Sequence, residues 1–375
     1  MTATAPYDLA PIASIAFIGA LLALGPVLWV WRRQREHGAP ARLRALTVLT
    51  LCLTFDLVLF GAFTRLTDSG LGCPDWPGCY GQASPQGAQA QIGAAQSVLP
   101  EGPVTHGKAW VEMTHRYLAT GVGALIVVLA ALSWVEARRR RLAISGWWAS
   151  ATLLWVCVQG AFGALTVTMK LYPLIVTLHL IGGMVLLVLL AAQVALTNHA
   201  PLVMPRGLFG GALALAGLSA LQIALGGWVS TNYAVLACGG FPSCQGNWWP
   251  SMDFEHGFAL LRELGAGNDG VALPFAALTA IHYVHRLVAY VLLLAMAVFA
   301  WRLRASRLAR PWAWATAALA LWQLASGLSN VVLGWPLIGA VAHTAGAAAW
   351  VTLLTLLIAG VRSGLGAFRK MQVSP

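Results

Sequence analysis

Nine long runs of apolar residues, almost free of charge, constrain the fold of this chain more than any other feature of its sequence. A helix of about 20 apolar residues crosses the hydrocarbon core of a membrane, and only helices or closed barrels satisfy their backbone hydrogen bonds there. Hydrophobic residues make up 59% of the chain and charged residues 9%, which excludes an ordinary soluble domain. The sequence therefore predicts an all-α integral membrane protein. The expected spans are residues 12–31, 43–66, 113–135, 146–168, 173–197, 208–231, 279–301, 311–333 and 336–361.

The net charge of +11 is explained by membrane topology and not by a nucleic-acid partner. Basic residues gather in every second loop and in the C-terminal tail, as the positive-inside rule requires of cytoplasmic segments. The N-terminus and both long loops, 67–112 and 232–278, are then predicted outside and the C-terminus cytoplasmic, in the bacterial inner membrane. No basic segment precedes the first span and no clear cleavage site follows it, so we expect a retained helix rather than a signal peptide. The basic residues are Arg32, Arg33, Arg35, Arg42, Arg44, Arg138, Arg139, Arg140, Arg141, Arg206, Arg302, Arg304, Arg307, Arg310, Arg362, Arg369 and Lys370.

Each long loop opens with a pair of cysteines at the same spacing, Cys73 with Cys79 and Cys238 with Cys244. Thiols outside the cytoplasm oxidise, so we expect one disulfide in each loop. Two roles are open for these pairs: a staple for a long loop, or a redox-active pair that passes electrons. The other two cysteines lie within expected helices and are predicted to be small apolar packing residues. They are Cys52 and Cys157.

The cysteine pairs belong to an internal repeat. A Tyr-Pro-Leu-Ile segment leads to His179, as a Trp-Pro-Leu-Ile segment leads to His343. His115 precedes His179 by 64 residues, and His285 precedes His343 by 58. Both copies begin on the inner side of the membrane, so the repeat is parallel. The predicted parts are an extra N-terminal helix with a basic loop at 1–42, a four-helix bundle at 43–200 and a second four-helix bundle at 201–375.

Each half can present two imidazoles near the outer membrane boundary, from two different helices. A neutral imidazole is a good axial ligand for haem iron, and a helical bundle can hold a haem between two facing ligands. Zinc fits less well, because it needs four ligands and no Asp or Glu accompanies His179 or His343. We therefore predict haem ligation by His115 with His179 and by His285 with His343. The small residues that follow these histidines would let a macrocycle approach the backbone, or would serve helix packing. They are Gly121, Gly123, Gly182, Gly183 and Gly346.

The two halves differ beside the histidines. Glu112 lies three residues before His115, where the second half has His282. A carboxylate near the membrane boundary is costly unless it is used, so Glu112 is a candidate catalytic residue that takes a proton or stabilises positive charge. The alternative is a helix N-terminal carboxylate that the helix dipole favours. Three roles are open for His282: a substitute ligand, a propionate contact or a residue at the end of the loop.

Three arginines complete the candidate sites. Arg116 and Arg286 each follow a candidate ligand and could pair with haem propionates, or could reach the membrane interface with their charged ends. Arg65 stands where the second half has Ser230 and is a further propionate or supporting residue. Asp56 lies within an expected span and has no assigned role.

Together these motifs resemble the haem A synthase family, over residues 43–361. No single motif decides the resemblance, but the set in its order is specific. Two features depart from the family pattern: the extra first helix, and a first cysteine pair that is closer together than in some members. The matching residues are Glu112, His115, Arg116, His179, His285, Arg286, His343, both cysteine pairs, the Thr-Arg-Leu-Thr-Asp-Ser-Gly run at 64–70 and Pro74-Asp75-Trp76-Pro77.

The resemblance implies two four-helix bundles and an oxidoreductase. Its reaction would convert the C8 methyl group of haem O to the formyl group of haem A by two successive hydroxylations. By analogy, the first half binds haem O through His115 and His179 with Glu112 as catalytic residue, and the second half holds a haem b that relays electrons through His285 and His343. The implied partners are haem O, membrane lipid and an electron donor that the sequence does not identify. Contact with the haem O-producing enzyme and a homo-oligomer are left open.

Two other functions fit a di-haem membrane protein. A non-enzymatic cytochrome b would pass electrons between its haems, and a haem transporter is compatible with a parallel repeat. Glu112 favours the enzyme, because electron transfer alone does not need a carboxylate there. Two haems near one face of the membrane also argue against electron transfer across it.

Overall fold

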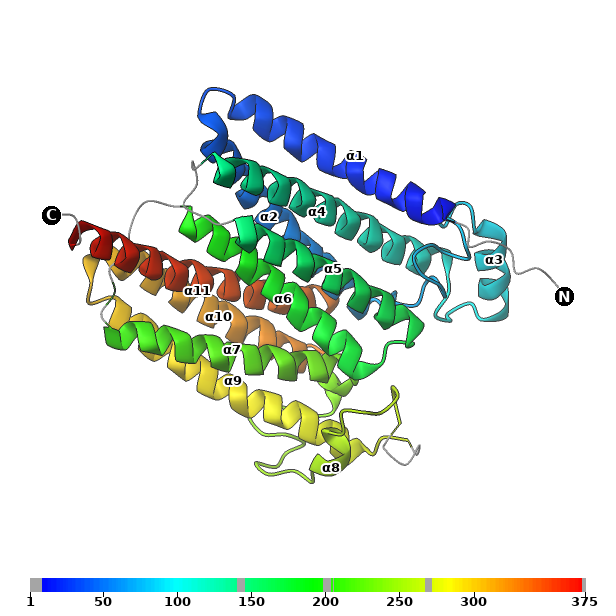
Figure 1. Cartoon of the computed structure of the whole chain (residues 1–375). Helices are drawn as coiled ribbons and strands as arrows, with labels where there is room; N and C mark the ends of the chain where they lie inside the picture. The colour runs from blue at the N-terminus through cyan, green and yellow to red at the C-terminus, as the bar shows by residue number, and fades with distance from the viewer. Residues whose placement is uncertain (1–8, 140–145, 198–203, 205, 267–271, 373–375) are drawn as a thin grey trace.

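The computed structural model describes residues 9–139, 146–197, 204, 206–266 and 272–372, and its described residues contain nine helices long and apolar enough to cross a membrane (Figure 1). All nine expected spans are confirmed: six lie wholly within a helix, and 173–197, 311–333 and 336–361 each extend one residue past a helix end. The chain is therefore an all-α integral membrane protein. The long helices are α1 (Ala10–Arg33), α2 (Gly38–Leu66), α4 (His106–Arg138), α5 (Gly146–Thr168), α6 (Pro173–Leu196), α7 (Arg206–Thr231), α9 (Phe275–Leu303), α10 (Arg310–Val332) and α11 (Leu337–Gln372).

Local sequence signals explain where these helices begin and how their polar side chains are accommodated. Thr105 caps α4 by accepting a hydrogen bond from the Lys108 amide at 3.2 Å. Pro173 is the first residue of α6, where its missing amide costs nothing. Inside the apolar spans, hydroxyl groups donate to the carbonyl four residues earlier, as Thr50 does to Leu46 at 2.8 Å. Thr47 and Thr54 do the same, so these three hydroxyls are satisfied within α2.

The helices form two rings of four. Helices α2, α4, α5 and α6 contact one another in a ring, and α7, α9, α10 and α11 form the equivalent ring. Helix α6 joins the rings by packing on α7 and α11, while α11 also touches α2. Helix α1 lies outside the rings and packs along α4 and α2 (Figure 1). These contacts group the helices as the predicted repeat does, and the residue boundaries 43–200 and 201–375 stay a prediction, since most of the linker lies outside the described residues.

The two long loops lie at the same end of the rings, marked by the short helices α3 (Gln89–Val98) and α8 (Phe254–Gly257) in Figure 1. The sequence did not predict either of these short helices. Both expected disulfides are present, with Cα–Cα distances of 4.9 Å for Cys73–Cys79 and 4.8 Å for Cys238–Cys244. All four of these cysteines are buried. Each loop is therefore closed over the end of its own bundle.

The prediction for the other two cysteines is wrong. Cys52 on α2 and Cys157 on α5 are free thiols with exposed side chains, so they do not pack inside the bundle. An apolar span has few polar residues to mark its outward face, so the sequence alone could not show which way these thiols point. Asp56 lies one turn after Cys52 on the same exposed side of α2.

Candidate functional site

The first histidine of each half lies against a glycine of the neighbouring helix. A Cβ atom placed on Gly61 of α2 would lie 3.0 Å from Cε1 of His115 on α4. A Cβ atom on Gly226 of α7 would likewise lie 3.0 Å from Cε1 of His285 on α9. Both distances are shorter than normal side-chain contacts, so glycine is what allows the imidazole to approach the helix backbone.

The second histidine of each half repeats this arrangement. Gly163 of α5 faces His179 of α6, where an added Cβ would lie 3.5 Å from Cε1. Gly327 of α10 faces His343 of α11, where it would lie 3.2 Å away. The two imidazoles within each half lie close enough to interact electrostatically. The structure therefore brings together the pairs that the sequence predicted.

The glycines that hold these rings are not those that the sequence analysis selected. Gly121 packs on Leu22 of α1, and Gly182 lies so close to the Gln159 amide that an added Cβ would overlap it. Both serve helix packing, which was the alternative reading. The signal for the correct glycines was available: Gly61 and Gly226 occupy equivalent positions in the two halves.

The donor set fits haem better than a bare metal ion. Among the described residues, no three His, Cys, Asp or Glu side chains gather as a protein-only metal site requires. A haem needs only two axial ligands, because the porphyrin supplies the other four nitrogens. Nδ1 of His115 and Nδ1 of His179 are buried without a hydrogen-bond partner in the described part of the chain. Two buried rings cradled by glycine, neither with a described side chain hydrogen-bonded to its Nδ1, match imidazoles that are held by a bound group instead.

Glu112 is buried, with 4% of its surface exposed, and both of its oxygens have partners. Oε2 accepts a hydrogen bond from the Cys73 amide at 2.7 Å. Oε1 pairs with Arg116 Nη2 at 2.5 Å. A buried carboxylate is stable only when it is paired and hydrogen-bonded in this way. Glu112 therefore links the helix of His115 directly to the first cysteine loop.

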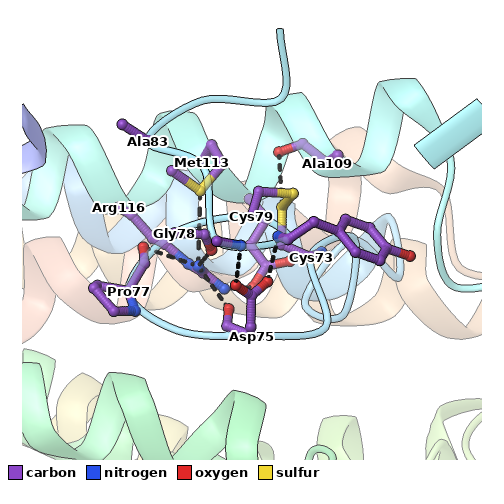
Figure 2. The surroundings of a disulfide bond; sticks show 12 residues. Cys73, Asp75, Pro77, Gly78, Cys79, Ala83, Ala109, Met113 and Arg116 are labelled. Carbon is purple, nitrogen blue, oxygen red and sulfur yellow. Dashed lines mark hydrogen bonds and ion pairs between the residues drawn. A yellow bond between two sulfur atoms is a disulfide. The ribbon is translucent and has the colours of Figure 1, made fainter. Parts of the chain in front are cut away.

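Arg116 is the main anchor of that loop (Figure 2). Its Nη1 lies 3.0 Å from the Asp75 carbonyl, 3.1 Å from the Pro77 carbonyl and 2.5 Å from the Gly78 carbonyl. The Asp75 carboxylate in turn accepts from the backbone amides of Tyr80 and Gly81, at 2.6 and 2.7 Å. A five-donor guanidinium suits this cluster of carbonyls.

In the second half Arg286 holds the cysteine loop as Arg116 does in the first, but its neighbour is His282 and not Glu112. Arg286 donates to the carbonyls of Gly240 at 2.9 Å, Ser243 at 3.2 Å and Cys238. Its Nε lies 3.3 Å from Nε2 of His282, whose Nδ1 lies 3.0 Å from the carbonyl of Ala234. Both ring nitrogens of His282 are thus engaged, which removes the substitute-ligand role. A propionate contact stays a prediction for Arg116 and Arg286.

Arg65 connects the two halves at the loop end. Its Nη2 donates to the Ser230 carbonyl at 2.7 Å, and its Nη1 pairs with Asp68 at 3.0 Å. The guanidinium also stacks over the ring of Tyr233, 4.2 Å from its centroid, and the Tyr233 hydroxyl donates to Asp68 at 2.6 Å. Burial raises the pKa of the Tyr233 phenol, so this hydroxyl keeps its proton. Arg65 thus contacts Ser230, the residue at the equivalent position of the second half.

A family model described as cytochrome oxidase assembly protein (COX15-CtaA) matches residues 44–356. The chain belongs to this family. The match to the COX15-CtaA model covers both histidine pairs and both cysteine loops, and it leaves α1 outside. The resemblance seen in the sequence is therefore confirmed, and α1 is an addition to what the family model describes.

Proteins named heme A synthase from three other organisms are similar to this chain along most of its length. The heme A synthase of Shewanella oneidensis is 36% identical over 326 residues, which cover 82% of this chain and 93% of that protein. The heme A synthase of Caulobacter vibrioides is 30% identical over 337 residues, covering 84% of this chain and 94% of that protein. The heme A synthase of Halalkalibacterium halodurans is 28% identical over 298 residues, covering 76% and 86%.

Proposed function

We propose that this chain is a haem A synthase, an oxidoreductase of the bacterial inner membrane that converts the C8 methyl group of haem O to the formyl group of haem A. One observation carries the proposal: two equivalent histidine pairs are cradled by glycines, and a buried carboxylate lies beside only one of them. The relatives named heme A synthase match along most of their length, which supports the same reaction.

In this proposal the first half binds the substrate. His115 and His179 would hold the iron of haem O, and Glu112 lies one helical turn from His115 on the same face of α4. Oxidation of a methyl group builds positive charge on its carbon, and a preorganised carboxylate stabilises that charge. The Cys73 amide and Arg116 fix the orientation of Glu112, so its oxygens need no rearrangement when the charge develops.

The second half serves the first. His285 and His343 would hold a haem b, which supplies one-electron redox chemistry when bound. The two rings contact each other through α6, α7 and α11, so the redox centre would lie in the same rigid body as the substrate site. Arg116, Arg286 and Arg65 support the loops and the junction between the halves. A contact of these arginines with haem propionates is part of the proposal.

The positive-inside distribution supports an orientation with the N-terminus and both cysteine loops outside and the C-terminus in the cytoplasm. Both loops lie at one end of the bundles, as this orientation requires. The substrate site would then open near the outer boundary of the membrane. Its partners would be haem O, lipid and a separate electron donor.

The pigments bound to the purified protein test the proposal against a di-haem electron carrier. Haem extracted from detergent-purified protein is separated by chromatography, and we expect haem O or haem A together with haem b. Haem b alone, in both halves, would support the carrier and contradict the enzyme. The single variants His115→Ala and His343→Ala assign each pigment to a half, because each removes one axial ligand.

A further inference from the structure

The two histidine pairs differ in what lies beside Nδ1 of each ring. In the second half, Nδ1 of His343 lies 3.0 Å from Ser326 Oγ, and Nδ1 of His285 lies 3.0 Å from Gln222 Nε2. In the first half, Nδ1 of His115 and of His179 has no hydrogen-bond partner among the described residues. The halves therefore share the ligands but not the residues behind them.

The bonds of Ser326 define the protonation of His343. The Ser326 hydroxyl lies 2.7 Å from the carbonyl of Trp322, which can only accept, so the serine proton is used there. The serine oxygen then accepts from Nδ1–H of His343. A neutral imidazole protonated at Nδ1 keeps its Nε2 lone pair free for iron. Gln323 fixes the same turn of α11 by donating to the His343 carbonyl at 3.0 Å.

Gln222 contacts His285 differently, because its amide nitrogen can only donate and so cannot accept from Nδ1–H of the ring. Its amide nitrogen lies 3.0 Å from Nδ1 and 3.3 Å from Nε2 of the ring, and 3.2 Å from the backbone carbonyl of the same histidine. A side chain held against both the ring and the backbone of one residue limits how that ring can turn. Gln222 comes from α7 and His285 from α9, so the contact also joins two helices of the second four-helix bundle.

The glycines that face the imidazoles give the equivalent positions in the first half. Gln222 is four residues before Gly226, and the residue four before Gly61 is Leu57. Ser326 directly precedes Gly327, and in the first half Phe162 directly precedes Gly163. Leucine and phenylalanine carry no hydrogen-bonding group, so neither can support an imidazole nitrogen. His115 instead lies parallel to the ring of Phe60, with centroids 6.3 Å apart.

We propose that Ser326 is a positioning residue that makes the second half a permanent haem site, and that Phe162 leaves the first half as an exchangeable one. A hydrogen bond to Nδ1, the ring nitrogen that does not bind iron, fixes the orientation of a ligating histidine and strengthens its bond to the metal. A resident cofactor benefits from that support, whereas a substrate site must release its product. This inference rests on the proposed function, since it assumes a haem in each half.

The test compares haem retention in purified full-length variants. Ser326→Ala is mixed with excess apomyoglobin, and the transfer of haem b is followed by absorbance. We expect release from this variant to be on the order of 10-fold faster than from the wild type, as for the loss of other such partners. Ser326→Thr keeps the hydroxyl and should restore slow release. Thr316→Ala is the matched control, because the Thr316 hydroxyl also bonds to the carbonyl four residues earlier, that of Trp312.

A low-spin haem signal in electron paramagnetic resonance distinguishes a ligand effect from general loss of packing. Ser326→Ala should shift that signal while Thr316→Ala leaves it unchanged. The reverse change, Phe162→Ser, should slow haem release from the first half. Wild-type release and signal in Ser326→Ala would overturn this inference but leave the proposed function standing. A wild-type protein without haem b would instead contradict the proposed function.

Discussion

In the first half Arg116 pairs with Glu112 and holds a cysteine loop, whereas in the second half Arg286 bonds to His282 and holds the equivalent loop. The two anchors are built alike: an arginine one turn after a polar residue, bonded to loop carbonyls beside a disulfide. Only the polar residue changes, from an acid to a neutral ring with both nitrogens engaged. The comparison teaches that both halves use the same arginine anchor, while the polar residue one turn before that arginine differs between them.

The largest expected effect is on occupancy of the second half. His285→Ala and His343→Ala each remove an axial ligand, so we expect loss of the tightly held haem b. The visible spectrum of purified protein, with haem content per chain, measures this. His256→Ala provides a control, because His256 lies in the second long loop, 232–278, and bonds only to Asp253 in the contacts described. A six-coordinate haem b spectrum retained in both ligand variants would break the assignment of the second half.

The second-largest expected effect distinguishes Glu112 of the first half from His282 of the second. Glu112→Gln keeps an oxygen for the Cys73 amide but removes the charge, so both haems should remain bound while oxidation of haem O falls on the order of a hundredfold or more. Haem O or a hydroxymethyl intermediate should accumulate, as measured by chromatography of cellular haems.

The equivalent change in the second half, His282→Gln, is the matched control and should leave the product unchanged. Because Glu112 is part of a buried ion pair, thermal unfolding of both variants must be recorded as well. Normal haem A in Glu112→Gln, with only lowered stability, would make this residue a structural one.

The smallest effect concerns the disulfides. Replacing Cys238 and Cys244 by alanine should lower the free energy of unfolding by about 2 kcal/mol, the loop-closure value for so short a loop, with activity per folded molecule preserved. Replacing Cys73 and Cys79 should cost similar stability and also lower activity, because the Cys73 amide is a direct partner of Glu112.

Thermal melts and turnover per folded molecule distinguish these outcomes. Equal loss of activity in both double variants would indicate that both pairs pass electrons. Alkylation of native protein without reductant, followed by mass spectrometry, checks the disulfides themselves. Only Cys52 and Cys157 should react, since both are exposed free thiols.

Much of this protein could be predicted from the order of its residues. The nine spans follow from hydropathy, because a helix in lipid needs a continuous apolar stretch of fixed length. The disulfide partners follow from spacing within each loop, and the two histidine pairs follow from the repeat. These features follow from short stretches of sequence or from their repetition along the chain.

Contacts between helices were decided only by the tertiary structure. That Gly182 packs on Gln159 and not beside a histidine, that Arg116 bonds to loop carbonyls, and that Cys52 points outward could not be predicted from the sequence. Each depends on how a helix is rotated about its own axis. In a membrane span nearly every face is apolar, so the sequence does not mark the inward one, and only close packing against neighbouring helices fixes the rotation.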